Sequence, residues 1–155
     1  MPTNARQFNG ELRRFVEVTV PEEVARFARR IALDALRRIV FRTPVDDGPA
    51  RGGWTVSIGS PATGPGIADP GGGSTVQRGS ILIAGAPPFQ TIHITNNQDH
   101  ILILEEGGFV PPDPGPSKDP REGRKGRILV SGGYSVQAPR GMAAITVEEI
   151  RQAFP

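Results

Sequence analysis

The strongest pattern along the chain is an apolar repeat between Val20 and Arg42. Pro21 opens it, and acidic residues follow in the first turn, which is typical of a helix start. Apolar positions then recur in steps of three and four: Val24, Phe27, Ala28, Ile31, Ala32, Ala35, Leu36, Ile39 and Val40. This spacing predicts one amphipathic helix. It should end near Arg42, because Pro44 disfavours helical geometry at Thr43.

Shorter helical patterns lie at both ends of the chain. Residues 7–18 carry Phe8, Leu12, Phe15 and Val16 at helical spacing, which predicts a short, separate helix. Near the C-terminus, Pro139 and Gly141 precede a segment, about 142–154, that predicts a last helix. Its apolar residues are Met142, Ile145, Val147, Ile150 and Phe154.

Alternating patterns predict a small sheet. Residues 54–58 and 90–96 alternate apolar and polar side chains, as half-buried strands do. Residues 80–85 fit either a strand or a turn of helix. Residues 101–106 favour a helix that ends at Gly107, although their β-branched content also suits a strand.

Residues 128–130 could re-enter a sheet. The elements together predict an α+β fold in which the long N-terminal helix and the C-terminal helix pack on a small, mostly antiparallel sheet.

Proline and glycine are concentrated in two segments. Gly 20 and Pro 16 account for 36 of the 155 residues, yet 21–42 contains one Pro and no Gly. We therefore expect a single domain, 1–155, with long Pro/Gly-rich loops at about 59–79 and 109–133.

Composition excludes several classes of protein. The chain has no Cys, so disulfides, thiolate chemistry and Cys-based zinc sites are excluded. No apolar run approaches the ~20 residues of a membrane span, and Met1 to Gly10 is too polar for the core of a signal peptide. The formal net charge of +2 is too small to indicate nucleic-acid binding by bulk charge.

The candidate chemistry is sparse. His93 and His100 are seven residues apart and need not converge, so an ordinary structural role is favoured over a metal or catalytic one. The run 71–75 is glycine-rich but lacks the Lys and spacing of a P-loop, which favours a flexible loop over a phosphate cradle. We therefore expect no catalytic residue, no cofactor and no metal.

The junction after the long helix holds the candidate structural motif. Its residues are Thr43, Pro44, Val45, Asp46, Asp47, Gly48, Arg51 and Trp54. Asp46 and Asp47 suit turn capping better than acid–base catalysis, because neighbouring side chains in an extended chain point apart. Trp54 is expected to anchor the core, and Arg51 to pair with Asp46 or Asp47.

A basic cluster lies in the second Pro/Gly-rich segment. Its residues are Arg121, Arg124, Lys125 and Arg127. They could contact DNA phosphates, which leaves a DNA-binding accessory protein as the alternative function. A solvated loop, or a contact with an acidic partner, is favoured.

Several short motifs occur in an order that resembles the HK97 gp10-like family of tailed-phage neck and tail-completion proteins. The helix end at 32–40 is followed by Thr-Pro-Val-Asp-Asp-Gly at 43–48 and Ala-Arg-Gly-Gly-Trp at 50–54. Downstream come Ile-Thr-Asn-Asn at 94–97, Leu-Glu-x-Gly at 104–107 and Gln-Ala-Pro-x-Gly-Met at 137–142. The resemblance covers roughly 8–59 and 90–154, and it departs from the family where 109–136 separates the last two motifs.

The resemblance implies a non-enzymatic structural protein of the virion. It implies a subunit of a ring at the head–tail junction of a long-tailed phage or prophage, commonly sixfold, assembled in the cytoplasm of the host bacterium. The implied partners are further copies of the chain, the adjacent head-completion or connector proteins, and the tail-tube or terminator proteins. Packaged DNA in the channel is a further possible partner, and no membrane is involved. The family defines no catalytic residues, so none are transferred.

Overall fold

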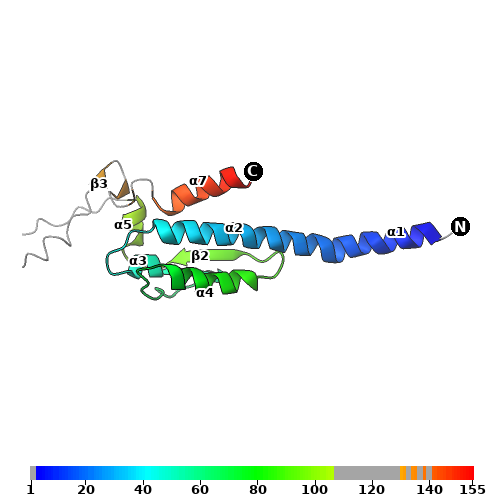
Figure 1. Cartoon of the computed structure of the whole chain (residues 1–155), viewed down its shortest axis with the longest axis horizontal. Helices are drawn as coiled ribbons and strands as arrows, with labels where there is room; N and C mark the ends of the chain where they lie inside the picture. Colours follow the sequence, from blue (N-terminus) through cyan, green and yellow to red (C-terminus); the bar gives the residue numbers. More distant parts are fainter. Residues whose placement is uncertain (1–2, 107–129, 132–133, 136–137, 139–140) are drawn as a thin grey trace, which may run out of the picture.

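The computed structural model describes residues 3–106, 130–131, 134–135, 138 and 141–155 and confirms the α+β fold (Figure 1). One long helical rod crosses the molecule. The helices α4 and α7 lie on opposite sides of it, and strand β2 lies on the α4 side. The predicted loop at 109–133 and the basic cluster from Arg121 to Arg127 fall outside the described residues, apart from 130–131.

The rod consists of α1 (Thr3–Arg14), a π-helical turn η1 (Phe15–Thr19) and α2 (Val20–Arg42). The prediction of a separate short helix at 7–18 was wrong, because the chain stays helical through the boundary. Pro21 has no N–H to donate to the preceding turn, and the backbone widens just before it. The Val20 N–H donates to the Phe15 carbonyl, which is the five-residue step of a π-turn.

The main sheet is a two-stranded antiparallel pair. Strand β1 (Trp54–Ile58) pairs with β2 (Ile92–Asn96), with Val56 opposite Ile94. Both strands were predicted, although β2 begins two residues later than expected. A second pair, β3 (Val130–Ser131) and β4 (Tyr134–Ser135), is separate from the first. The expected entry of 128–130 into a sheet is confirmed at Val130, although this sheet is not the main one.

Four further helices complete the described chain. They are α3 (Pro49–Gly52), α4 (Gly73–Ala84), α5 (Ile101–Glu106) and α7 (Ala143–Ala153). The helix at 101–106 is confirmed over its rival strand, and the last helix is confirmed. The predicted loop at 59–79 was wrong in its second part, because α4 begins at Gly73 and includes the ambiguous residues 80–84.

The core lies where α2 crosses the sheet and α4. Leu36 and Val40 of α2 are fully buried, and α4 closes on them because Gly79 brings its backbone against Leu36 and Val56. The other buried core residues are Ala32, Ile39, Ala50, Trp54, Val56, Ile83, Ile101, Leu104, Ala138 and Met142. Among the described helices, none is long and apolar enough to cross a membrane.

Candidate functional site

Thr43 is the centre of the junction that the sequence singled out. Its side chain is fully buried, and its hydroxyl donates to the Ile39 carbonyl at 2.7 Å. The same oxygen accepts the indole N–H of Trp54, also at 2.7 Å. Trp54 is 8% exposed, so the prediction of a core anchor is confirmed. One hydroxyl therefore joins the end of α2 to the start of β1.

Arg51 holds the same junction through backbone carbonyls. Its guanidinium donates to the Thr43 carbonyl at 2.9 and 3.1 Å and to the Pro70 carbonyl at 2.9 Å. The predicted pairing with Asp46 or Asp47 was therefore wrong. Both carboxylates are exposed, and among the described residues they make no hydrogen bond, so the expected turn capping was also wrong.

The segment 60–69 lies directly over the glycine pair at 52–53. A Cβ on Gly52 would lie 2.0 Å from the Ile67 carbonyl oxygen and 2.4 Å from the Asp69 nitrogen. Asn97 fastens the segment by donating to the carbonyls of Ala62 and Gly64, at 2.8 and 3.1 Å. The first half of the predicted loop is therefore an ordered cover for the junction.

Asp69 caps α4, a role that the sequence reading missed. Its carboxylate accepts the Gly72 N–H at 3.0 Å, and the Thr75 N–H and hydroxyl at 2.7 and 2.9 Å. The glycine run 71–75 is therefore the start of a helix, and the prediction of a flexible loop was wrong. The positive N-terminal end of this helix, where an anion could bind, is already occupied by the chain's own carboxylate.

The cap gives a pH-dependent contribution to stability. Burial raises the pKa of Asp69, but the hydrogen bonds from Thr75 and Gly72 outweigh burial and hold the pKa below its ordinary value. A lowered folded-state pKa stabilises the fold fully above the unfolded value of about 3.9, and the stabilisation is lost as the pH falls through the folded pKa.

Wild type should therefore unfold at higher urea than Asp69→Asn at pH 7, and the gap should shrink below about pH 4. Urea titrations across this pH range measure the gap. Asp47→Asn, at an exposed carboxylate, is the control and should stay within about 0.5 kcal/mol of wild type at pH 7. A gap that stays constant from pH 7 to pH 2 would contradict the assignment.

Glu105 caps α7 in the same way. Its carboxylate accepts the backbone N–H groups of Met142, Ala143 and Ala144 at 2.6, 2.9 and 2.8 Å. Gly141 has φ +70°, and a Cβ there would lie 2.5 Å from the Glu105 Oε1. Two sequence motifs that lie far apart in the chain thus meet as one unit, because the carboxylate fits only against a glycine.

Replacing Glu105 with alanine should lower the free energy of unfolding by about 1–2 kcal/mol, because the N–H groups at the start of α7 lose their acceptor. Glu106→Ala, which removes an exposed carboxylate from the same helix, is the matched control. Hydrogen exchange at Met142 to Ala144 should accelerate only in Glu105→Ala. Equal effects of the two variants on stability and exchange would rule out the cap.

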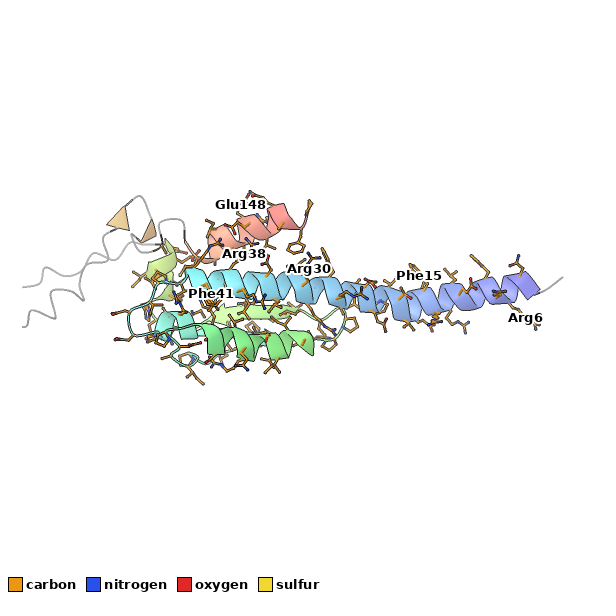
Figure 2. The ribbon with its side chains drawn as sticks, viewed as in Figure 1. Arg6, Phe15, Arg30, Arg38, Phe41 and Glu148 are labelled. Atoms are coloured by element: carbon orange, nitrogen blue, oxygen red, sulfur yellow. The ribbon has the colours of Figure 1, made fainter. Side chains whose placement is uncertain are left out.

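Ion pairs attach α7 to α2. Glu149 accepts from Arg42 at 2.7 Å and also from Arg38, which in turn binds Asp34 at 3.0 Å. The hydrogen bonds from Arg42 and Arg38 lower the pKa of Glu149. Figure 2 shows Arg38 between the two helices. Each of these groups is about one-third exposed, so the pairs orient α7 more than they stabilise it.

The histidines form no joint site in the described structure. An imidazole nitrogen of His93 lies 3.2 Å from the Gly59 carbonyl oxygen, beside the end of β1. In the described part of the chain, no three His, Asp or Glu side chains come together as metal ligands would. The polar groups of the junction and of both helix caps are used to hold the fold.

The largest unpartnered feature is the free part of the long helix. We name residues 3–19 the arm; it projects beyond the body, with Phe15 far from the other elements (Figures 1 and 2). Its exposed apolar side chains are Phe8, Leu12, Phe15, Val16 and Val18, which are 61, 48, 54, 57 and 44% exposed. The arm is thus apolar along part of its surface, although within the described chain nothing covers it.

Sequence reasoning found the junction residues but missed the contacts that organise it. Asp69 could have been found from the Asp-Pro-Gly run before a Ser-Thr pair, which is a helix-start pattern. The pairing of Glu105 with α7 had no local signal, because 37 residues separate Glu105 from Met142. Comparisons with protein-family profiles, with curated proteins and with solved structures give no match to this chain.

Proposed function

We propose that the chain is a structural virion protein of a long-tailed phage or prophage. It acts as a subunit of a ring at the head–tail junction, as a neck, tail-completion or tail-terminator protein. It contacts head-completion or connector proteins on one side and tail-tube or terminator proteins on the other. It carries no catalytic site and assembles in the cytoplasm of the host bacterium.

The observation that carries the proposal is the exposed apolar arm. An isolated subunit gains little from a projecting helix whose Phe and Leu side chains face water, whereas an assembled subunit buries them. The motifs at 43–54, 94–97, 104–107 and 141–142 support the same function. Their polar groups hold the junction, the cover of the glycine pair and the α7 cap, which suits a subunit that keeps its shape within an assembly.

The native mass of the purified protein tests the proposal, measured by light scattering alone and then with tail tubes or portal-bearing heads. The expected result is a closed oligomer, either in isolation or only on one of these assemblies, with ring-shaped particles in electron micrographs. A monomer under all three conditions would contradict the proposal. A monomer retained on duplex DNA, with an affinity that falls steeply with salt, would favour the DNA-binding alternative.

A further inference from the structure

Helix α7 buries very little of its own surface. It lies along α2, on the side away from α4 and β2 (Figure 1). Of its 11 residues Thr146 alone is buried, whereas α4, with 12 residues, buries Thr75, Gly79 and Ile83. A helix in a protein gains most of its stability from the face that it packs against its neighbours. Helix α7 is therefore held much less firmly by packing than α4.

The first turn of α7 is fixed to the body. Met142, just before the helix, is fully buried in the core, and Ala143 packs against the same core. The Glu105 carboxylate accepts the N–H groups of Met142, Ala143 and Ala144. The start of the helix can therefore leave the body only if the cap and the core contacts break together.

The middle of α7 is attached to α2 by polar groups. The Thr146 hydroxyl accepts from Arg42 at 3.3 Å. One turn later, the Glu149 carboxylate accepts from both Arg42 and Arg38. These charged side chains are about one-third exposed, and ion pairs of this kind contribute little to stability and are screened by salt. Water and ions can therefore replace the contacts in the middle of the helix.

The far end of α7 is incompletely packed on α2. An open hollow of about 390 Å³ lies there, lined by Ala153 and Phe154 on one side and by residues of α2 that include Arg30 and Leu33 on the other. The Phe154 ring meets Phe27 edge to face at 5.8 Å, and the Arg30 guanidinium lies 5.6 Å from the ring. Firmly packed elements leave few voids larger than a water molecule. This end is therefore held mainly through one aromatic side chain.

We propose that residues 147–154, which we name the strap, leave α2 as one unit while the core and the Glu105 cap stay in place. A helical segment this short is not stable alone in water, so the released strap unwinds. Its release uncovers Phe27 and Leu33 and separates Arg42 from the carboxylate of Glu149. The strap thus controls how much of the long helix is uncovered. This inference goes beyond the proposed function and does not depend on it.

Hydrogen exchange of the native protein in low concentrations of urea tests the strap. Exchange through a local opening hardly depends on urea, whereas exchange through global unfolding accelerates with urea. The amides of 147–153 should share one protection factor, at least about tenfold below those of Leu36 and Val40, with almost no urea dependence. The same protection and urea dependence as Leu36 and Val40 would overturn the inference. Protection that declines residue by residue toward Ala153 would also overturn it, because that pattern is fraying.

A matched pair of variants tests what fastens the strap. Glu149→Gln removes the charge that Arg38 and Arg42 share, and all amides of 147–153 should exchange about two- to fivefold faster, by one common factor. Glu148→Gln is the control, because this exposed carboxylate bonds only within α7, to Gln152 at 2.9 Å. It should leave the exchange unchanged. Equal effects of the two variants, or an effect confined to the amides next to residue 149, would overturn the inference.

Salt provides a second test of the same fastening. Raising the salt concentration from about 0.05 M to about 0.5 M screens the pairs that Glu149 makes with α2. The difference in strap exchange between wild type and Glu149→Gln should therefore narrow as salt is added. A difference that stays constant over this range would show that these ion pairs do not fasten the strap.

Discussion

Replacing Gly52 with alanine should destabilise the protein by at least about 3 kcal/mol, the upper end of the cost of overpacking. The added Cβ would lie 2.0 Å from the Ile67 carbonyl oxygen and 2.4 Å from the Asp69 nitrogen. Both are backbone atoms, so no side-chain rotation can relieve the contact. The segment would have to move away, and Asp69, which caps α4, would move with it.

Urea titration followed by the fluorescence of Trp54, the only Trp, measures this loss beside the affected site. Gly64→Ala is the matched control, because a Cβ there meets nothing within 4 Å in the same covering segment. The control should stay within about 0.5 kcal/mol of wild type. Similar midpoints for the two variants would show that the segment does not lie against Gly52.

Replacing Leu36 with alanine should lower the free energy of unfolding by about 2–5 kcal/mol. Leu36 is fully buried on α2 and fills the space opposite Gly79 of α4. Truncation leaves a cavity where the long helix, α4 and β1 meet. Leu102→Ala, at a 64% exposed residue, should change the stability by less than about 0.5 kcal/mol.

The partner of Leu36 makes the prediction more specific. A Cβ on Gly79 would lie 2.4 Å from the Leu36 Cδ2 and 2.8 Å from the Val56 Cγ2, so Gly79→Ala alone should be destabilising. In the double variant the new methyl occupies part of the cavity. Its loss of stability should fall short of the sum of the single losses by about 1 kcal/mol or more. Additive losses would mean that α4 does not pack on Leu36.

Local patterns predicted the elements whose signals are local. The repeat of α2, the Pro44 stop, the alternation of β1 and the buried Trp54 each depend on neighbouring residues, and all are confirmed. Helix α4 was missed in part because its first residues are glycine-rich and its capping carboxylate, Asp69, lies before its first turn. The helix propensities of the residues within α4 take no account of a capping residue that lies outside the helix.

The partners of charged residues were harder to predict. Arg51 was assigned to carboxylates that lie near it in sequence, but the fold brings the Thr43 and Pro70 carbonyls within reach of its guanidinium. The ion pairs that Arg38 and Arg42 of α2 make with Glu149 of α7 join residues more than 100 positions apart. No periodic pattern in the sequence predicts such contacts, because they depend on how the whole chain packs.

The cap on α7 also determines how the chain can vary in length. The Glu105 Oε2 lies 2.6 Å from the Met142 nitrogen, so the cap fixes Glu105 and Met142 close together in space. Closing a flexible loop costs little more when the loop is longer, about 0.6 kcal/mol for each doubling. Lengthening the chain between Glu106 and Val130 should therefore cost the body little stability, provided that the buried Ala138 and the close approach of Gly141 to Glu105 are kept.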